Sequence, residues 1–360
     1  MRLSRSLGLR GPLKRTLRRR GRQRAHEIES VYSLRKNLAA FLLIALSFIL
    51  VSCDREKGPR QEVVLYTSVD EPVARPIIKE FERQTGIAVV LRTDAEATKT
   101  AGLAERIEAE KGNPQADVWW SNEVFHTINL AQQKVFAAYD SPSAAKIPAN
   151  FKDPGHLWAG TSLRVRVIAV HNPPQSVKGL EDLGAAPLRG KICMARPMAG
   201  TTKGHMAVLY TAWGRDRFEQ YLKQLKTNEI RLVGGNSIVA EMVGSGQMLA
   251  GLTDNDDVDS ASREGGKLEM VIPDQESFGA LAIPCTTALV AGAPHEANAK
   301  KLIDYLLSQT VEYLLIDRRF ARYSVFNPPA GIKLMPVDYT KAAGNMKDAV
   351  ELSLKTLEGR

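Results

Sequence analysis

Residues 63–92 read VVLYTSVDEPVARPIIKEFERQTGIAVVLR, and the fold class follows from their pattern. The apolar run 63–67 predicts a buried strand. Apolar residues three and four positions apart over 72–84 predict an amphipathic helix, and Gly86 is typical of a helix end. The run 87–92 predicts a second strand. A strand–helix–strand unit of this length indicates parallel strands in an α/β protein.

The same alternation continues along the chain. Further strands are predicted at 117–120, 165–170, 191–195, 230–233, 248–253 and 282–290, and helices at 98–111, 122–133, 201–213, 216–226, 238–244, 294–307 and 311–320. We therefore expect an α/β fold in which mixed, mainly parallel sheets are flanked by helices. About 300 residues are more than one core usually fills, so two lobes are expected.

The charge of the chain is concentrated at its start. The formal net charge is +9, but residues 1–52 hold twelve basic and two acidic side chains, which leaves 37 basic against 38 acidic residues in the rest. A nearly neutral body argues against nucleic acid as a partner. A hydrophobic content of 44% with 25% charged residues is ordinary for a globular protein.

An apolar segment over 38–51 follows the basic pair that begins at Arg35. It is shorter than the roughly 20 residues that span a bilayer, and it has the architecture of a signal peptide. It ends at Leu-Val-Ser-Cys53, which resembles the lipobox of bacterial lipoproteins. The sequence thus predicts a leader and lipoprotein signal over 1–52, lipidation of Cys53 and a tether over 53–61.

Polar segments follow the predicted strands. In open α/β sheets, ligands bind beyond the carboxyl ends of the strands. The candidate ligand-binding residues in these segments are Ser68, Asp70, Thr98, Lys99, Asn122, Glu123, Thr201, Thr202, Lys203, Asn236 and Ser237.

Two glycine-containing turns are candidates for anion binding. Residues 200–205 (GTTKGH) lie between a predicted strand and a helix, and residues 234–237 (GGNS) lie at an equivalent place. Exposed amides, two hydroxyls and a lysine there suit a phosphate, a phosphonate or a carboxylate. Plain helix capping by a threonine is the alternative.

Four aspartates between 254 and 259 form an acidic cluster at a strand end. Carboxylate oxygens suit hard cations, so Asp256 and Asp257, together with Asp70 and Glu123, are the candidate metal ligands. Two alternatives stay open. Aspartates at a helix start cap amides and favour the helix dipole, or they accept hydrogen bonds from a ligand amine or hydroxyl.

Arginines and tryptophans accompany these segments. Arg164 and Arg166 flank a predicted strand, where they form either a carboxylate clamp or a solvated pair. Trp119 and Trp120 alternate across a strand, which predicts one in the core and one at the ligand site.

Catalysis finds no support in the sequence. A GxSxG elbow, an HExxH pair, a kinase signature and a dinucleotide fingerprint are all missing. His126 and His295 have no partners at ligand spacing and are interpreted as surface residues. We therefore expect a protein that is not an enzyme and has no cofactor.

Five segments in order resemble periplasmic solute-binding proteins of ABC importers, in particular the ferric-iron-binding group. They are LYTSVDEPVARPIIKEFERQTGI, PQADVWWSNE, LRGKICMARPMAGTT, GGNSIVAEMVGSGQMLAGLTDND and IPCTTALVAGAPHEANAKKLIDYLLS. The resemblance implies a two-lobed type II periplasmic-binding-protein fold with a ligand cleft at the hinge. Residues 62–170 and 273–360 would form lobe 1, and 171–272 lobe 2.

The resemblance also implies a function. The chain would be a monomeric, lipid-anchored periplasmic protein that closes on one small ligand and delivers it to an ABC permease in the inner membrane. The family's metal-binding histidine, glutamate and tyrosine pair correspond here to Asp70, to Asn122 with Glu123, and to Asp256 with Asp257. Ferric iron is the cargo that the family implies, a phosphate- or phosphonate-bearing solute is the alternative, and a ligand-sensing receptor subunit is an alternative of another class.

Overall fold

The computed structural model describes residues 61–93, 100–171, 177–317, 321–326 and 329–359, within the compact unit Gln61–Arg360. The predicted leader, the tether before residue 61 and the lipidation site Cys53 lie outside the described residues. Within the described part, no helix is long and apolar enough to cross a membrane.

Ten strands form one hydrogen-bonded arrangement in the order β2-β1-β3-β10-β5-β8-β6-β7, with β4 paired to β10 and β9 to β5. The strands are β1 (Glu62–Thr67), β2 (Ala88–Thr93), β3 (Val118–Ser121), β4 (Phe136–Ala137), β5 (Ala159–His171), β6 (Ile192–Ala195), β7 (Arg231–Val233), β8 (Ala250–Asp254), β9 (Leu268–Val271) and β10 (Ala282–Val290). Outer neighbours such as β1–β2 and β6–β7 pair in parallel, whereas β5 and β10 pair antiparallel with their neighbours. The predicted mixed α/β class is confirmed.

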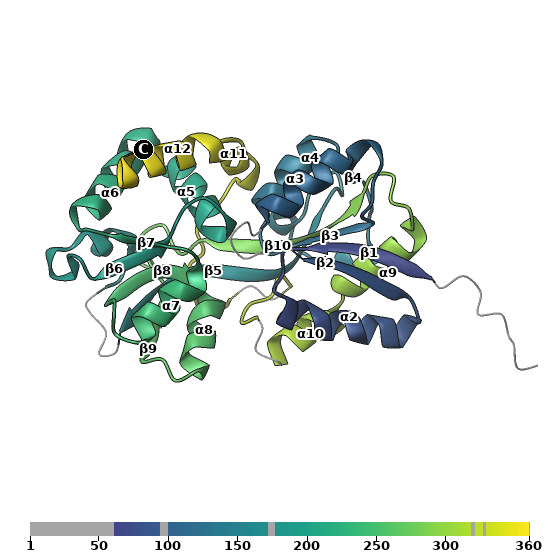
Figure 1. Cartoon of the computed structure of the whole chain (residues 1–360), viewed down its shortest axis with the longest axis horizontal. Coiled ribbons are helices and arrows are strands. Elements are labelled where there is room, and N and C mark those ends of the chain that lie inside the picture. Colours follow the sequence, from purple (N-terminus) through teal and green to yellow (C-terminus); the bar gives the residue numbers. More distant parts are fainter. Residues whose placement is uncertain (1–60, 94–99, 172–176, 318–320, 327–328, 360) are drawn as a thin grey trace, which may run out of the picture. The chain divides into compact units, whose positions relative to one another are not determined.

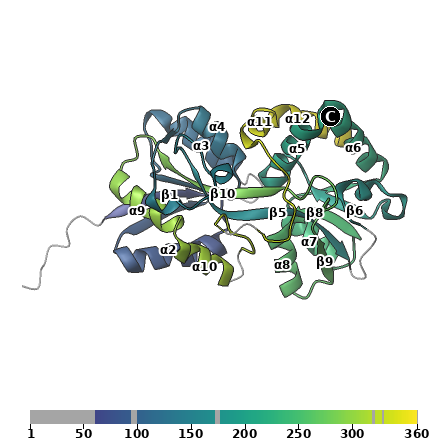
Figure 2. The same ribbon diagram turned by 180° about the vertical axis from the view of Figure 1, so that it is seen from behind.

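Strand β5 belongs to two sheets. Its first half, from Ala159 to Val165, pairs with β10. Its second half, from Arg166, pairs with β8 and β9. Figures 1 and 2 show β5 and β10 running between two groups of elements, which we call the first lobe (around β1–β3) and the second lobe (around β6–β8).

Helices cover both faces of each sheet (Figure 1). In the first lobe they are α2 (Glu71–Thr85), α3 (Ala101–Ala109), α4 (Phe125–Gln132), α9 (Glu296–Leu306) and α10 (Gln309–Asp317). In the second they are α5 (Gly200–Trp213), α6 (Arg215–Thr227), α7 (Asn236–Gly244) and α8 (Asn255–Arg263). Helices α3 and α4 pack on one face of the first sheet, and α2, α9 and α10 on the other.

Local sequence explains why the helices begin and end beside the strand ends. Helix α2 carries a proline in its first turn and ends at Gly86, whose φ of 71° is in the left-handed region. The amide of Gly86 donates to the carbonyl oxygen of Glu82 at 2.8 Å. The buried face of α2 holds Ile77 and Phe81, as the helical spacing predicts.

The last two helices differ from the predicted domain boundary. Residues 273–360 were expected to return to lobe 1. Instead, α12 (Met346–Glu358) packs on α5 and α6 of the second lobe, and α11 (Tyr339–Gly344) contacts α4 and α5. At the end of α12, Glu358 forms a bidentate ion pair with Arg196, in which both N–O distances are 2.5 Å. Helix α12 packs there because it has an apolar face, and Leu352 on this face is buried in the hydrophobic core of the second lobe.

A glycine allows α4 and α5 to approach closely. A Cβ added at Gly204 in α5 would lie 2.0 Å from the ring of Phe125, which is fully buried. We expect Gly204→Ala to lower the free energy of unfolding by about 1–3 kcal/mol, because the ring has no room to move. Urea unfolding measures this change. Gly344→Ala is the matched control, since nothing lies within 4 Å of its added Cβ. Equal stabilities of the two variants would contradict the expectation.

Candidate functional site

A cavity of about 380 Å³ lies where the strands of both lobes end. It is lined by the residues that follow β1, β3, β6, β7 and β8, as the rule for open α/β sheets predicts. The first turns of α5, α7 and α8 all contribute to the wall, and Arg164 of β5 lines it as well. The predicted residues that line the cavity are Asp70, Asn122, Thr201, Thr202, Asn236, Ser237, Asp256 and Asp257.

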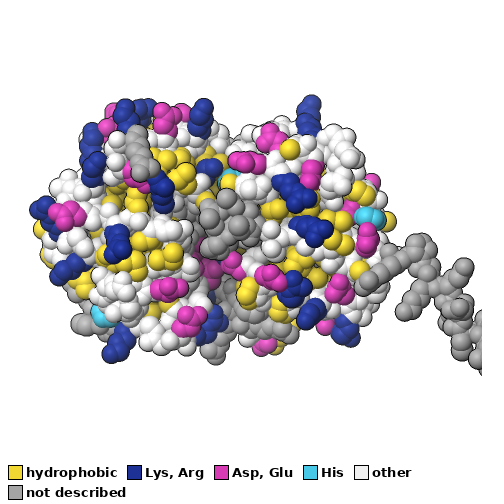
Figure 3. Space-filling view, viewed as in Figure 1, with side chains coloured by type: hydrophobic (Ala, Val, Ile, Leu, Met, Phe, Trp, Pro, Cys, Tyr) yellow, Lys and Arg dark blue, Asp and Glu magenta, His cyan; other side chains and the backbone are white. Residues whose placement is uncertain are grey.

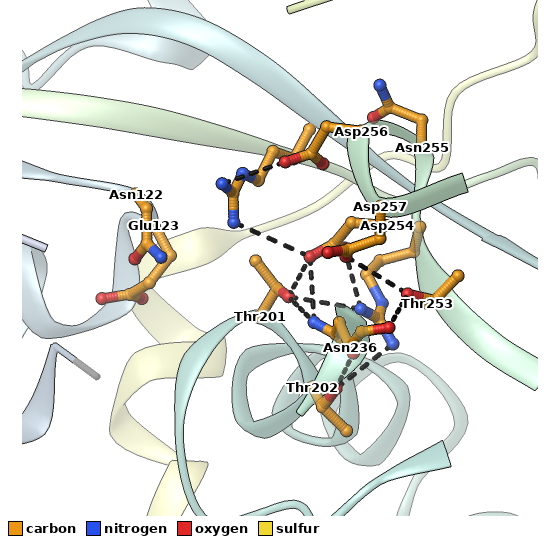
Figure 4. A network of polar contacts seen from close by, with 12 residues as sticks. Asn122, Glu123, Thr201, Thr202, Asn236, Thr253, Asp254, Asn255, Asp256 and Asp257 are labelled. Atoms are coloured by element: carbon orange, nitrogen blue, oxygen red, sulfur yellow. Dashed lines mark hydrogen bonds and ion pairs between the residues drawn. The ribbon is translucent and has the colours of Figure 1, made fainter. Parts of the chain in front are cut away.

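A buried ion pair lies under this wall. Arg166 Nη1 lies 2.8 Å from Asp254 Oδ1, and both side chains are fully buried. The same guanidinium donates to the hydroxyls of Thr201 and Thr202 at 3.2 and 3.3 Å, and its Nε donates to Nδ1 of His205 at 3.3 Å. Figure 4 shows the side chains of Thr201, Thr202, Asn236 and Asp254 turned toward one another from the starts of α5 and α7 and the end of β8. The arrangement fixes the start of α5 against the end of β8.

The two threonine hydroxyls are used within the protein. Thr201 Oγ1 donates to Asp254 Oδ2 at 2.5 Å and accepts from Asn236 Nδ2 at 2.8 Å. Thr202 Oγ1 donates to Asn236 Oδ1 at 2.9 Å (Figure 4). The sequence predicted these side chains as ligand contacts. Their hydroxyls are therefore taken up by hydrogen bonds within the protein, while no side chain caps the backbone amides at this helix start, which lines the cavity.

Two helices begin at the cavity without side-chain caps. The residues before α5 and α7 are Ala199 and Gly235, and neither helix start has a side-chain cap hydrogen bond. The first amides of a helix carry partial positive charge and seek acceptors. Both turns predicted to bind anions therefore present the groups that anion binding needs.

Arg164 lies among carboxylates. Its Nη2 is 3.0 Å from Asp256 Oδ2 and 3.6 Å from Asp70 Oδ2, and its Nη1 is 3.9 Å from Asp254 Oδ2. Asp70 follows β1 of the first lobe, whereas Asp254 and Asp256 belong to the second. Neither arginine is a solvated residue, since the side chains of Arg164 and Arg166 are 16% and 0% exposed and both pair with aspartates of the protein itself.

The acidic cluster begins a helix. Asp254 is the residue before α8, and Asp256 and Asp257 lie in its first turn, so the cluster does lie at a helix start, but the side chain of Asp254 makes no cap hydrogen bond. Oxygen atoms of these three aspartates lie within 4.8 Å of one another, a spacing that could hold a metal ion. Burial raises the pKa of Asp256, while the Arg164 guanidinium lowers it. The Asp256 Oδ1 atom is buried without a hydrogen-bond partner.

Glu123 lies outside the cavity wall, although the sequence places it among the metal ligands. Its carboxylate accepts from the amide of Phe125 at 2.6 Å and lies 3.0 Å from His126 Nδ1. It therefore caps α4. Asn122 accepts hydrogen bonds from the hydroxyls of Ser68 and Thr100. Ser68 therefore holds Asn122 in the cavity wall but does not line the cavity itself.

Other predicted residues also lie away from the cavity. Lys203 is not among the residues that line it, and burial lowers the pKa of its ammonium, against the effect of Glu123. Thr98 and Lys99 lie outside the described residues. The expected split between Trp119 and Trp120 is wrong, because both are buried.

The histidine interpretation is also wrong. His126 is buried beside Glu123. His295 is partly buried, and its amide and Nδ1 contact the fully buried carboxylate of Asp117 at 2.6 and 2.9 Å. Asp117 is 178 residues from His295 in sequence, which explains why spacing did not reveal that pair, whereas Glu123 lies only three residues before His126 and was considered as a metal ligand instead.

Two further residues of the cavity wall were not predicted from the sequence. Ser260 and Arg263 of α8 line the cavity together with Asp256. Their positions four and seven residues after Asp256 lie on one face of a helix, so that spacing would have revealed them had α8 been predicted.

Fold and site together define a two-lobed binding protein. Residues 63–317 match the bacterial extracellular solute-binding protein family, and the chain belongs to that family. The Fe(3+)-binding periplasmic protein of Serratia marcescens is 24% identical over 332 residues, which are 88% of this chain and 96% of that protein.

Solved structures share the fold. The periplasmic binding protein AfuA of Actinobacillus pleuropneumoniae, with exogenous fructose-6-phosphate bound, has a TM-score of 0.73 at 22% identity and covers 83% of this chain and 99% of its own. The ferric binding protein of Campylobacter jejuni has a TM-score of 0.72 at 20% identity, with 82% and 99% covered. The predicted type II fold and the resemblance to the ferric-iron-binding group are confirmed.

Proposed function

We propose that this chain is the solute-binding component of an ABC importer, anchored through Cys53 and facing the periplasm as a monomer. Family membership supports the binding role. The described surface also fits a protein without nucleic-acid partners, since basic and acidic side chains are interspersed on the face in Figure 3. Closure of the two lobes on one solute would present the loaded form to the permease.

The proposed cargo is a small organic molecule with a phosphate or phosphonate group and a hydrogen-bond donor. The observation that carries this proposal is the convergence of two uncapped helix starts, of α5 and α7, on one cavity that Arg164 also lines. Amides at helix starts and guanidinium groups are the usual partners of phosphoryl oxygens. The fructose-6-phosphate in the AfuA structure supports this class of cargo.

The donor requirement comes from Asp256. A buried carboxylate oxygen without a hydrogen-bond partner is costly, and a ligand amine or hydroxyl would satisfy it. Cargo with a phosphoryl group at the helix starts and an ammonium or hydroxyl group near α8 would use both sides of the cavity.

Ferric iron is the second candidate. It is favoured by the spacing of the Asp254, Asp256 and Asp257 oxygens and by the Serratia relative. Against it, no tyrosine or histidine is among the described residues that line the cavity. Two of the three aspartates also have an arginine as their partner.

A matched pair of ligands tests the proposal. Protein stripped of solute by unfolding and refolding is heated with an aminoalkyl phosphonate, with the alkyl phosphonate of equal length, or with ferric citrate. Ligand at about 100 times its dissociation constant adds roughly 2.7 kcal/mol to the stability. We expect the phosphonates to raise the melting temperature and the amine to strengthen binding about tenfold, an advantage that Asp256→Asn removes.

The control variant is Asp348→Asn in the first turn of α12, away from the cavity residues. It should bind both phosphonates as the natural protein does. A melting shift with ferric citrate alone would overturn the phosphonate proposal and establish the second candidate.

A further inference from the structure

Arg164 is held where it touches both lobes. It lies in β5 opposite Ile283 of β10, close to the point where β5 passes from one sheet to the other. Its side chain is 16% exposed, and it reaches carboxylates from each lobe. A guanidinium in a central strand cannot leave the site as a dissolved ion can.

The carboxylates around it divide into two groups. Asp254 has a second arginine, Arg166, at 2.8 Å, and that pair is fully buried. Asp256 pairs with Arg164 at 3.0 Å, and the same guanidinium lies 3.6 Å from Asp70. Removal of the Arg164 charge would take from Asp70 and Asp256 the cation that they share.

A metal ion that entered the cavity would have to take carboxylate oxygens from this arginine, whereas a ligand ammonium needs only the unpartnered Oδ1 atom of Asp256. Like charges at such distances repel strongly when water is scarce, and the carboxylate oxygens that a hard cation prefers already contact the guanidinium. An oxyanion, in contrast, is attracted by the N–H groups of the same side chain.

We propose that Arg164 determines the class of cargo by acting as a built-in cation, which satisfies the carboxylates of both lobes and excludes metal ions from the cavity. This proposal rests on the function proposed above, because it explains why the acidic cluster serves an oxyanion-bearing solute. Its consequence is that a neutral side chain at position 164 turns the cavity into a site for hard cations.

The test measures terbium(III) binding by isothermal titration calorimetry. We expect Arg164→Gln to bind terbium(III) at least tenfold more tightly than the natural protein, and the gain to vanish in the double variant Arg164→Gln/Asp256→Asn. The matched control is Arg196→Gln, which removes a positive charge from the same cavity wall but from a residue paired with Glu358. Equal affinities of Arg164→Gln and Arg196→Gln would overturn the proposal, as would tight terbium binding by the natural protein.

A second variant covers the case in which Arg164→Gln does not fold. Arg164→Gln/Asp70→Asn removes one charge of each sign, so the net charge of the site is unchanged. It should bind terbium(III) more tightly than Asp70→Asn alone, and equal affinities would overturn the proposal. Failure of the phosphonate proposal is recognised separately, because it appears as the lack of a melting shift with phosphonates in the natural protein.

Discussion

Replacing Arg166 by methionine is expected to lower the free energy of unfolding by about 3–5 kcal/mol. The cause is the carboxylate of Asp254, which is fully buried and lies 2.8 Å from the guanidinium. Methionine fills much of the space but leaves that charge without a cation. Denaturation in urea, monitored by circular dichroism, gives the change.

The effect should extend to binding. Arg166 also donates to the hydroxyls of Thr201 and Thr202, so its loss frees the first turn of α5 from the end of β8. We expect a phosphonate ligand to bind Arg166→Met at least tenfold more weakly. That loss would show that the buried pair positions the helix start.

Two controls separate the buried charge from a general effect of arginine loss. Arg189→Met removes an exposed ion pair with Glu229, whose side chains are 65% and 57% exposed, and should change stability by less than about 1 kcal/mol. Asp254→Asn, added to Arg166→Met, removes the unpaired charge and should restore part of the stability. No difference between Arg166→Met and Arg189→Met would contradict the argument.

The second large effect is a loss of stability in acid that depends on His205. This imidazole is buried, and burial lowers its pKa well below the ordinary value of 6.5, with a further lowering from Arg166. In the unfolded chain the imidazole takes up a proton below about pH 6.5, whereas in the folded protein it stays neutral. The unfolded state therefore binds more protons, and stability falls as the pH falls.

The size of this loss can be bounded. Between pH 6.5 and the folded-state pKa, one such group contributes a slope of about 1.4 kcal/mol per pH unit. We expect His205→Gln to lack this contribution, because glutamine keeps an acceptor for Arg166 but does not titrate. Unfolding free energies measured from pH 7.5 down to pH 4.5 give both slopes.

The matched control is His156→Gln, since the side chain of His156 is 48% exposed. Its slope should equal that of the natural protein. Asp256 has the opposite effect on the pH dependence of stability, because burial raises its pKa. This effect is the same in the natural protein and in both variants. The difference between their slopes therefore reports on His205 alone. Parallel curves for His205→Gln and the natural protein would contradict the expected loss.

Much of the fold could be predicted from local pattern. Strands such as β1 and β10 lie where apolar runs occur, and α2 lies where helical spacing and Gly86 predict it. Helix α8 was predicted only as one of the alternatives for the acidic cluster, which charge alone could not separate from a metal site. Helix α12 could not be assigned to a lobe, since an amphipathic pattern shows that a face is buried but not which neighbour covers it.

The sequence predicted where the site residues lie better than it predicted which groups they bind. Strand ends placed Thr201, Asn236 and Asp256 at one cavity. Their bonding depends on Arg166, which is 88 residues from Asp254 and 35 from Thr201 in sequence. Such pairing is set by the arrangement of β5 beside β8, which residue spacing along the chain does not reveal.

The position of β10 determines when the chain can fold. Strand β10 lies between β3 and β5, so Trp120 of β3 pairs with Thr287. The first sheet is thus incomplete until residues up to Val290 have been synthesised, and the first half of β5 lacks its partner β10 until then. Pairing over such sequence distances is slow, because the loop must close before the contacts form. A nascent chain of this protein therefore cannot complete the sheet of its first lobe until β10 has been made.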